Sequence, residues 1–479
     1  MKILIAASEA VPFSKTGGLA DVVGALAQQL KRMGVDVRVI VPKYKGTKGV
    51  ERLKQVGHFN VGLGWRNRYC GLESTEHEGV TYYFVDNQQY FERENCYSYA
   101  DDGERFAFFC RAVLESIQYT GFVPDIIHCN DWQAGLIPAM LKAQYSHIVK
   151  MADIKTVYTI HNLKYQGVFP IPGMNEMLGL PAEYLRFDGL EYFGNLNCMK
   201  GGIVYCDALT TVSPTYAKEI QTGEYGEGLD GTVRAHSAKL HGILNGIDTE
   251  MWNPAKDEHI PTKYSASTFE KKAGNKMALR EALGLDVSED LPVIGMVTRL
   301  VDQKGLHLVR DVFDELMKLP VQLAVLGAGE REYEMLFRWA ADSVYRGRVG
   351  LHLGMNEALA HQIYAGSDIF LMPSLFEPCG ISQMMAMRYG SIPLVRETGG
   401  LMDTVKPYNE YADKGYGFSF SYPNSADMLY TIRRALDFYS QKEVWSKLAL
   451  RCMKKDFSWK EPAKKYIQLY NQLHEGTSS

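Results

Sequence analysis

The sequence predicts an α/β protein with two doubly wound, parallel-sheet domains. Short runs rich in Val, Ile and Leu alternate with helix-like stretches along most of the 479 residues. Nearly continuous apolar runs of this kind are typical of parallel strands that helices cover on both faces. The alternation falls into two series separated by a polar stretch, and two series indicate two sheets.

Each series supplies enough short strands for one sheet. The first series comprises residues 3–7, 37–41, 82–85, 126–128, 156–160, 209–212 and 243–244. The second comprises residues 293–297, 323–326, 349–353, 369–372, 392–395 and 418–420. We therefore expect one domain over residues 1–245 and a second over 246–457. Residues 458–479 have an amphipathic helical pattern, which by itself does not decide which domain the helix caps.

The composition excludes several classes of protein. The chain has 52 basic and 56 acidic residues, a net charge of -4, whereas nucleic-acid binding depends on clustered Lys and Arg. The apolar run at the N-terminus is too short for a secretory signal, and no run approaches the roughly 18 residues of a membrane span. The eight cysteines form no C-x-x-C pair. We expect a cytoplasmic protein with reduced thiols that needs no metal or cofactor and binds neither nucleic acid nor membrane.

One internal similarity is unusually close. Residues 15–23 match residues 397–405 at six of nine positions, including Thr-Gly-Gly-Leu in both copies. Each copy follows an expected strand and precedes an expected helix. One interpretation is two similar strand-to-helix turns without further role. The other is a pair of anion-binding turns, because glycine permits close approach of the backbone and helix N-termini attract negative charge.

Cations and glycines follow the strands of the second series. Arg299 and Lys304 follow the strand at 293–297, and together they can neutralise a diphosphate. The alternative is two solvated surface cations. Open parallel sheets bind ligands at the carboxyl ends of their strands, so these ends indicate a site for a phosphorylated ligand. The Gly327-x-Gly329 motif is weak evidence, because a dinucleotide fingerprint requires a third glycine where Glu332 stands.

Glu377 lies in a turn rich in Pro and Gly before an expected helix at 382–388. A carboxylate repels phosphate, so a ligand role requires a neutral, hydroxyl-rich group such as a sugar. Its alternative role is to stabilise the start of that helix.

Polar residues also follow two expected strands of the first series. Asp131 follows the strand that begins at residue 126, and His161-Asn162 follows the strand at 156–160. A single histidine is more often a structural hydrogen-bonding group, but one that shares a strand edge with an aspartate is a candidate for chemistry. Aromatic residues are dense between positions 82 and 109, where packing in the core is the common role and stacking on sugars the alternative. Motifs of P-loop NTPases, zinc proteases and α/β-hydrolases are missing from the sequence.

Taken together, five motifs resemble those of bacterial glycogen synthase and plant starch synthase. They are Lys15 with the first Thr-Gly-Gly-Leu copy, His161-Asn162, Arg299 with Lys304-Gly305, residues 376–380, and the second Thr-Gly-Gly-Leu copy. The resemblance spans the whole chain, with its motifs in the same order. It implies a GT-B architecture, in which two Rossmann-like domains face a deep cleft and the C-terminal helix returns to the N-terminal domain. It also implies transfer of glucose from ADP-glucose to the nonreducing end of an α-1,4-glucan such as glycogen, with retention of configuration. The N-terminal domain would serve the acceptor and the C-terminal domain the donor.

The resemblance assigns roles by position. The residues expected at the reaction centre are His161, Glu377, Arg299, Lys304 and Asp131. The residues expected to bind substrate are Lys15, Gly17, Gly18, Asp21, Asn162, Asn245, Cys379, Gly380, Thr398, Gly399 and Gly400. Met385 replaces the second glutamate of the broader E-x7-E pattern, as in the ADP-glucose branch, and Met355 stands where some members stack a tyrosine on adenine.

Three alternatives share part of this pattern. A UDP-glucose-using glucosyltransferase differs in its base contacts. A glucan phosphorylase needs a lysine that holds pyridoxal phosphate, and a non-catalytic glucan-binding protein has no need to keep the cations and Glu377 together. For the transfer itself, same-face attack is favoured over double displacement, because no carboxylate is clearly placed as a nucleophile.

Overall fold

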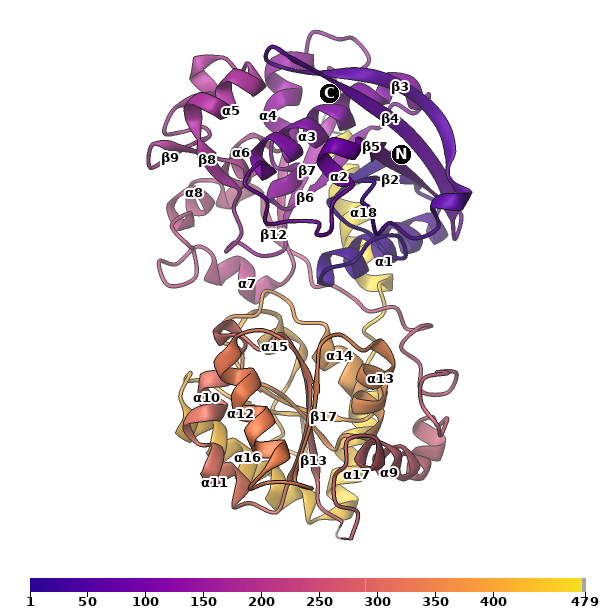
Figure 1. Ribbon diagram of the computed structural model, residues 1–479, viewed down its shortest axis with the longest axis vertical. Coiled ribbons are helices and arrows are strands. Elements are labelled where there is room, and N and C mark those ends of the chain that lie inside the picture. Colours follow the sequence, from indigo (N-terminus) through magenta and orange to yellow (C-terminus); the bar gives the residue numbers. More distant parts are fainter. Residues whose placement is uncertain (289, 476–479) are drawn as a thin grey trace. The chain divides into compact units, whose positions relative to one another are not determined.

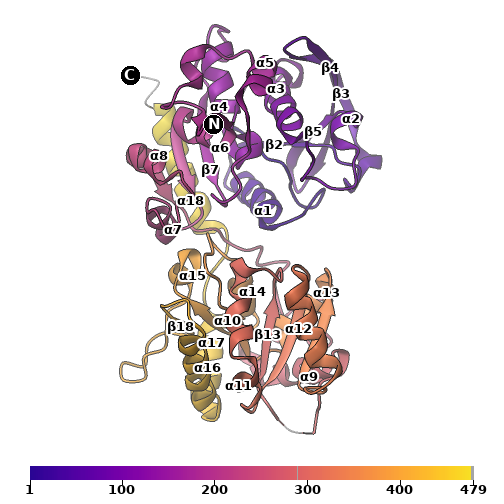
Figure 2. The same cartoon turned by 60° about the vertical axis from the view of Figure 1, so that its left-hand side comes forward.

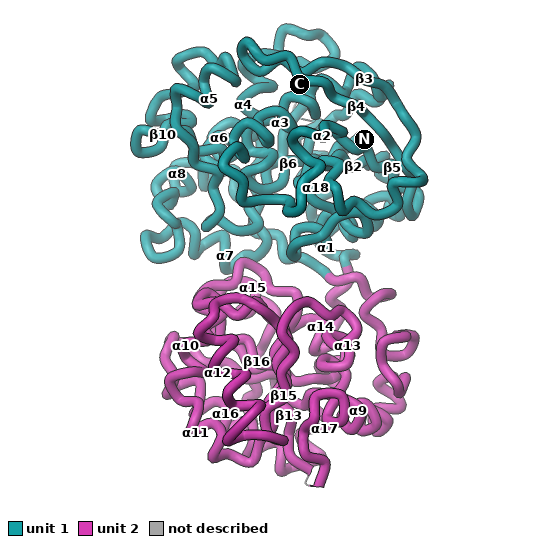
Figure 3. The backbone as a smooth tube through the Cα atoms, in the orientation of Figure 1, with its two compact units in different colours: residues 1–246, 459–479 teal, residues 247–458 magenta. Residues whose placement is uncertain are grey.

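The computed structural model describes residues 1–288 and 290–475. The chain forms two compact units, which are coloured separately in Figure 3. Unit 1 contains Met1–Gly246 together with the chain from Trp459 onward, and unit 2 contains Ile247–Ser458. Each unit is built on its own sheet with helices on both faces (Figure 1).

The sheet of unit 1 has nine strands in the order β12-β11-β7-β6-β1-β2-β5-β4-β3. Its parallel strands are β1 (Lys2–Ala6), β2 (Asp36–Pro42), β5 (Val80–Asp86), β6 (Ile126–Asn130), β7 (Lys155–Ile160), β11 (Ala208–Thr211) and β12 (Leu240–Gly242). These strands match the apolar runs of the first series, except that the last lies just before residues 243–244. β12 is a short edge strand, paired only with β11, so it needs no apolar run.

An antiparallel hairpin extends this sheet beyond β5, and the sequence pattern did not predict it. β3 (Lys54–Leu63) and β4 (Arg66–His77) alternate buried and exposed residues over part of their length, because the hairpin has a solvent-facing side. The same unit has a small antiparallel sheet of β8 (Val168–Pro170), β10 (Asn195–Asn197) and β9 (Glu191–Tyr192). These strands are too short to leave a sequence pattern.

The helices of unit 1 are amphipathic. In α1 (Gly18–Arg32), Val22, Leu26 and Leu30 lie on one buried face, and the last turn carries basic residues that favour a helix C-terminus. The others are α2 (Gln88–Phe91), α3 (Asp102–Thr120), α4 (Ile137–Met140), α5 (Ile171–Leu178), α6 (Cys198–Tyr205), α7 (Pro214–Glu219), α8 (Asp230–Ala235) and α18 (Lys460–Glu475). Among the described helices, none has both the length and the apolar character that crossing a membrane requires.

The sheet of unit 2 is wholly parallel, with six strands in the order β15-β14-β13-β16-β17-β18. The strands are β13 (Val293–Val297), β14 (Gln322–Gly327), β15 (Val349–Leu353), β16 (Ile369–Met372), β17 (Ile392–Arg396) and β18 (Phe418–Phe420). They are flanked by α9 (Lys272–Ala282), α10 (Leu306–Asp311), α11 (Phe313–Met317), α12 (Arg331–Asp342), α13 (Glu357–Gly366), α14 (Ser382–Arg388), α15 (Gly399–Thr404), α16 (Ser425–Tyr439) and α17 (Lys442–Met453) (Figure 2). The strand order is that of a classic doubly wound fold.

The C-terminal helix α18 is part of unit 1. Its residues Ala463, Tyr466, Leu469 and Tyr470 belong to the same buried cluster as strands β1 and β2. The Tyr470 hydroxyl lies 2.7 Å from Nδ1 of His128, whose Nε2 lies 2.5 Å from Thr159 Oγ1. Burial lowers the pKa of His128 to about 3, so the ring is neutral. Both of its nitrogens have a hydrogen-bond partner.

We expect Tyr470→Phe to lower the free energy of unfolding by about 1–3 kcal/mol, because it leaves Nδ1 of His128 buried without a partner. Urea unfolding followed by tryptophan fluorescence measures the change. Lys465→Ala, at an exposed position on the same helix, is the control and should shift stability by less than about 0.5 kcal/mol. A Tyr470→Phe protein as stable as the wild type would contradict this account of how α18 is held.

Candidate functional site

The strand order of unit 2 places its candidate site at one point of the sheet edge. From β13 the chain winds outward through β14 and β15, whereas from β16 it winds the opposite way through β17 and β18. The connections after the adjacent strands β13 and β16 therefore diverge, and this is the position at which open parallel sheets bind ligands. Arg299 and Lys304 follow β13, and Glu377 follows β16.

Lys304 and Glu377 meet at this point. Lys304 Nζ lies 2.6 Å from Glu377 Oε2, and Ser374 Oγ donates to the same oxygen at 3.0 Å. Only 7% of Glu377 is exposed, so the carboxylate is buried, whereas its partner Lys304 is half-buried. Arg299 lies in the same loop as Lys304, with its Nη2 3.2 Å from Gln303 Oε1. The predicted cations and the predicted carboxylate thus belong to one cluster. Ser374 and Gln303 also belong to it, although the sequence did not identify them as site residues.

The second glycine turn packs against the loop that carries Glu377. A Cβ on Gly399 would lie 2.0 Å from the carbonyl oxygen of Glu377, and one on Gly400 would lie 2.1 Å from that of Cys379. The Gly400 N–H donates to the carbonyl oxygens of Glu377 and Pro378 at 3.1 and 3.2 Å. Both positions require glycine because the Glu377 loop lies too close to leave room for a Cβ atom. This close packing fixes the position of the Glu377 loop.

The remaining predicted residues of this loop region lie beside that contact. Thr398 is buried and immediately precedes α15. Cys379 is 5% exposed. Gly380 has φ of +65°, a left-handed conformation that a side chain strains.

Unit 1 has its own divergence point, between β1 and β6. The chain winds from β1 to β2 and β5 on one side, and from β6 to β7, β11 and β12 on the other. Asp131 directly follows β6, His161 directly follows β7, and the first glycine turn lies between β1 and α1. The predicted residues of the first half therefore stand at the equivalent edge of this sheet.

Asp131 and His161 are in contact through the backbone. The His161 N–H donates to Asp131 Oδ1 at 2.8 Å, and burial raises the pKa of the Asp131 carboxyl to about 7. Asp131 also has φ of +52°, which is uncommon for a residue with a side chain. Backbone strain of this kind is often found at functional sites, where the surrounding structure holds it in place.

The neighbour Asn130 fixes the tautomer of His161. Asn130 Nδ2 donates to the carbonyl oxygens of Ala6 and His128, so its Oδ1 is left to accept from His161 Nε2 at 2.8 Å. The proton assigned by this network lies on Nε2, and Nδ1 carries the lone pair. Burial lowers the pKa of His161 to about 3, which keeps the ring neutral near pH 7.

A buried carboxylate, that of Glu9, is hydrogen-bonded to the first glycine turn, and the sequence did not identify it. Glu9, only 3% exposed, accepts the N–H of Thr16, and burial raises its pKa to about 7. Lys15 Nζ lies 2.8 Å from Asp21 Oδ1 in the first turn of α1. The position of Glu9, just after an apolar run, was the one signal that could have identified it.

A pocket of about 430 Å³ opens beside this turn. Ser14, Lys15 and Thr16 form one wall, and residues 93–98 form another. Of the dense aromatic residues in this region, Tyr83, Tyr90, Phe91 and Phe106 are buried in the core, whereas Tyr97 lines the pocket. Core packing is therefore the role of most of them.

Two predicted residues remain, Asn162 and Asn245, of which Asn162 also hydrogen-bonds the Asp131 carboxylate through its backbone. Asn162 Oδ1 accepts the N–H of Lys164 at 3.1 Å and orders the loop after β7. Asn245 is 5% exposed, and within the described residues its Oδ1 has no hydrogen-bond partner. A buried, unpaired acceptor favours a polar ligand.

Sequence comparisons cover both units. Residues 2–235 match the family "Starch synthase catalytic domain", and residues 282–450 match "Glycosyl transferases group 1". Glycogen synthase from Desulforamulus reducens is 53% identical over 475 residues, covering 99% of each chain. Glycogen synthase from Geobacillus stearothermophilus is 52% identical over 475 residues, covering 99% of this chain and 98% of that protein.

The structure resembles solved glycosyltransferases. It matches the catalytic domain of starch synthase IV from Arabidopsis thaliana, bound to ADP and acarbose, with a TM-score of 0.93 and 36% identity over 99% of both chains. Sucrose-phosphate synthase from Thermosynechococcus elongatus, at 17% identity and a TM-score of 0.63 over 99% of both chains, shares the fold. The fold and the charged switch-point loops define a glycosyltransferase of the GT-B class, as the sequence predicted. Within that class, the chain belongs to the bacterial glycogen synthase family.

The raised pKa of Glu9 predicts a pH-dependent contribution to stability. Its folded-state value of about 7 exceeds the ordinary 4.5, so between these values the folded chain keeps a proton that the unfolded chain has lost. Stability from this group is complete below pH 4.5 and falls as the pH rises towards 7. Glu9→Gln removes this loss.

We therefore expect the unfolding free energy of Glu9→Gln, relative to wild type, to rise by about 1.4 kcal/mol per pH unit between pH 5 and 7. Urea titrations of both proteins across this range measure the difference, in which the opposing contributions of His128 and His161 cancel. A difference that stays constant with pH would show that Glu9 is ionised in the folded protein.

Proposed function

We propose that this protein elongates an α-1,4-glucan by transferring glucose from ADP-glucose to its nonreducing end, with retention of configuration. The observation that carries the proposal is the contact between Lys304 and the buried Glu377 at the switch point of unit 2, in a chain related over its full length to glycogen synthases. Glycogen is the acceptor that this family relationship favours, and ADP-glucose the donor.

The cations of unit 2 serve the leaving group. Cleavage of the glucose–phosphate bond places negative charge on departing ADP and positive charge on the anomeric carbon. Arg299 and Lys304 neutralise the phosphates, and preorganised charges of this kind are usually the largest source of rate enhancement. Lys304 is held by Glu377 before the donor binds, so its position is set in advance.

The remaining groups serve the sugar. Glu377 accepts hydrogen bonds from glucose hydroxyls through its carboxylate. His161, neutral and with its lone pair on Nδ1, accepts from a sugar hydroxyl, and Asp131 fixes the loop that presents it. The further substrate-binding residues we assign are Lys15, Gly17, Gly18, Asp21, Asn162, Asn245, Cys379, Gly380, Thr398, Gly399 and Gly400.

Retention is assigned to same-face attack. The acceptor hydroxyl attacks the anomeric carbon from the side that ADP leaves, and its proton passes to the departing phosphate oxygen. Glu377 is already engaged with Lys304 and Ser374, which argues against its use as a nucleophile. Trapping of a covalent glucosyl-enzyme would replace this mechanism by double displacement.

The activity is tested by release of nucleotide from ADP-glucose in the presence of glycogen primer. We expect ADP release that depends on the primer, and slower release of UDP from UDP-glucose. Absence of release from both donors would overturn the proposed function.

In the same assay we expect Lys304→Ala and Arg299→Ala each to lower kcat by about 10²–10³-fold, because each removes a charge that stabilises the leaving group. Lys318→Ala, an exposed cation of unit 2 away from the switch-point loops, is the control and should turn over at the wild-type rate. Near-wild-type kcat in both site variants would rule out the leaving-group role.

A further inference from the structure

The pocket beside Lys15 has a wall without regular secondary structure. Residues 92–98 connect α2 to the turn before α3 without helix or strand, and residues 93–98 line the pocket. A segment of this kind has no ladder of backbone hydrogen bonds to fix its shape, so its position depends on side-chain contacts.

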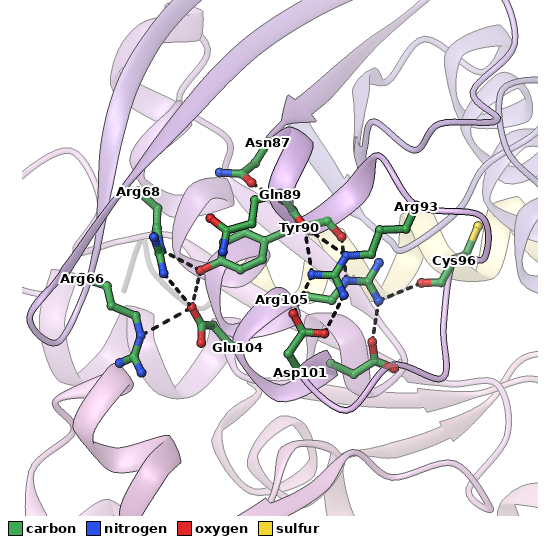
Figure 4. Close-up of polar contacts among 11 residues, drawn as sticks. Arg66, Arg68, Asn87, Gln89, Tyr90, Arg93, Cys96, Asp101, Glu104 and Arg105 are labelled. Carbon is green, nitrogen blue, oxygen red and sulfur yellow. Dashed lines mark hydrogen bonds and ion pairs between the residues drawn. The ribbon is translucent and has the colours of Figure 1, made fainter.

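Arg105, in the first turn of α3, makes several of those contacts (Figure 4). Its guanidinium is 0% exposed. Nε donates to the carbonyl oxygen of Tyr90 at 2.7 Å, and Nη1 donates to that of Cys96 at 3.2 Å and to Asp102 Oδ1. One side chain therefore joins Tyr90, two residues before the segment, to Cys96 within it.

Asp102 and Arg93 extend the same arrangement. The other carboxylate oxygen of Asp102 accepts the N–H of Ser98 at 2.9 Å, and Ser98 has φ of +74°, a strained value for serine. Arg93 donates from both terminal nitrogens to Asp101 at 2.6 Å. The segment is thus held at its start, middle and end by groups at the N-terminus of α3.

The wall is connected to the first glycine turn. The Tyr97 hydroxyl lies 2.7 Å from Ser8 Oγ, and Ser8 precedes Glu9, which holds the N–H of Thr16. A shift of residues 92–98 would therefore disturb the Tyr97–Ser8 contact and the opposite wall, which carries Lys15.

We propose that Arg105 is a positioning residue for glucosyl transfer, which fixes residues 92–98 as the pocket wall facing Lys15. This rests on the proposed function, in which Lys15 is a substrate-binding residue. Arginine is required because Nε and Nη1 reach two separate carbonyl oxygens, whereas lysine has a single nitrogen. Within the described residues Nη2 has no hydrogen-bond partner, so the geometry of the other two nitrogens determines the contact.

Cys96 provides a direct readout of the wall. It is half-buried, whereas the other seven cysteines are buried, and burial raises the pKa of its thiol to about 11. Release of the segment exposes this thiol, raises its thiolate fraction and accelerates its alkylation. The buried cysteines report global unfolding in the same experiment.

The test compares Arg105→Lys and Arg105→Met with wild type and with Arg68→Met. Arg68 belongs to the same polar cluster but bonds the Tyr90 hydroxyl and Glu104, not residues 92–98 (Figure 4). Iodoacetamide labelling is mapped by mass spectrometry, and kcat and KM are measured for ADP-glucose. Arg105→Lys, which keeps the charge, remains informative if Arg105→Met does not fold.

We expect Arg105→Lys to label Cys96 at least about 10-fold faster, with the other cysteines unlabelled, and to lose up to about 10²-fold in kcat/KM from misplacement of the wall. Arg68→Met should match wild type in both measurements. Wild-type labelling of Cys96 in Arg105→Lys would overturn the proposal, as would faster labelling with unchanged kcat/KM. If wild type itself releases no ADP, the proposed function fails, while the labelling still reports whether Arg105 fixes the segment.

Discussion

The structure depends on one topological constraint, which is the reversal of winding direction in each parallel sheet. In unit 2 the reversal lies between β13 and β16, and in unit 1 between β1 and β6. At these points the loops that follow neighbouring strands diverge, and open parallel sheets bind their ligands there. Lys304 and Glu377 share one such edge, and Asp131, His161 and the first glycine turn share the other. The chemistry is thus placed by strand order rather than by proximity in sequence.

Much of this arrangement was predictable from sequence. Continuous apolar runs identify buried parallel strands, and residues after such strands share an edge, so Lys304 and Glu377 were expected near one another although 73 positions separate them. Their ion pair was not predictable, because side-chain partners depend on the path of each loop. The β3–β4 hairpin was missed because strands with a solvent-facing side lack a continuous apolar run. Glu9 and Asn130 were missed because burial and partners, not residue type, give them their roles.

One amide in each glycine turn is hydrogen-bonded within the protein itself. In the first turn the Thr16 N–H is taken by Glu9, and in the second the Gly400 N–H is taken by the carbonyl oxygens of Glu377 and Pro378. These amides stabilise the loops themselves. In the proposed function, a few side-chain cations neutralise the donor diphosphate, and a chain with a net charge of -4 can supply them.

The most direct test of glucan elongation is the position of newly added glucose in the product. The protein is incubated with ADP-glucose labelled in the sugar and with glycogen, and the isolated polymer is digested with β-amylase, which releases maltose from nonreducing ends of α-1,4-linked chains. We predict that the label enters the polymer and is released as maltose. Label that does not enter the polymer, or that stays in the β-amylase-resistant fraction, would contradict it.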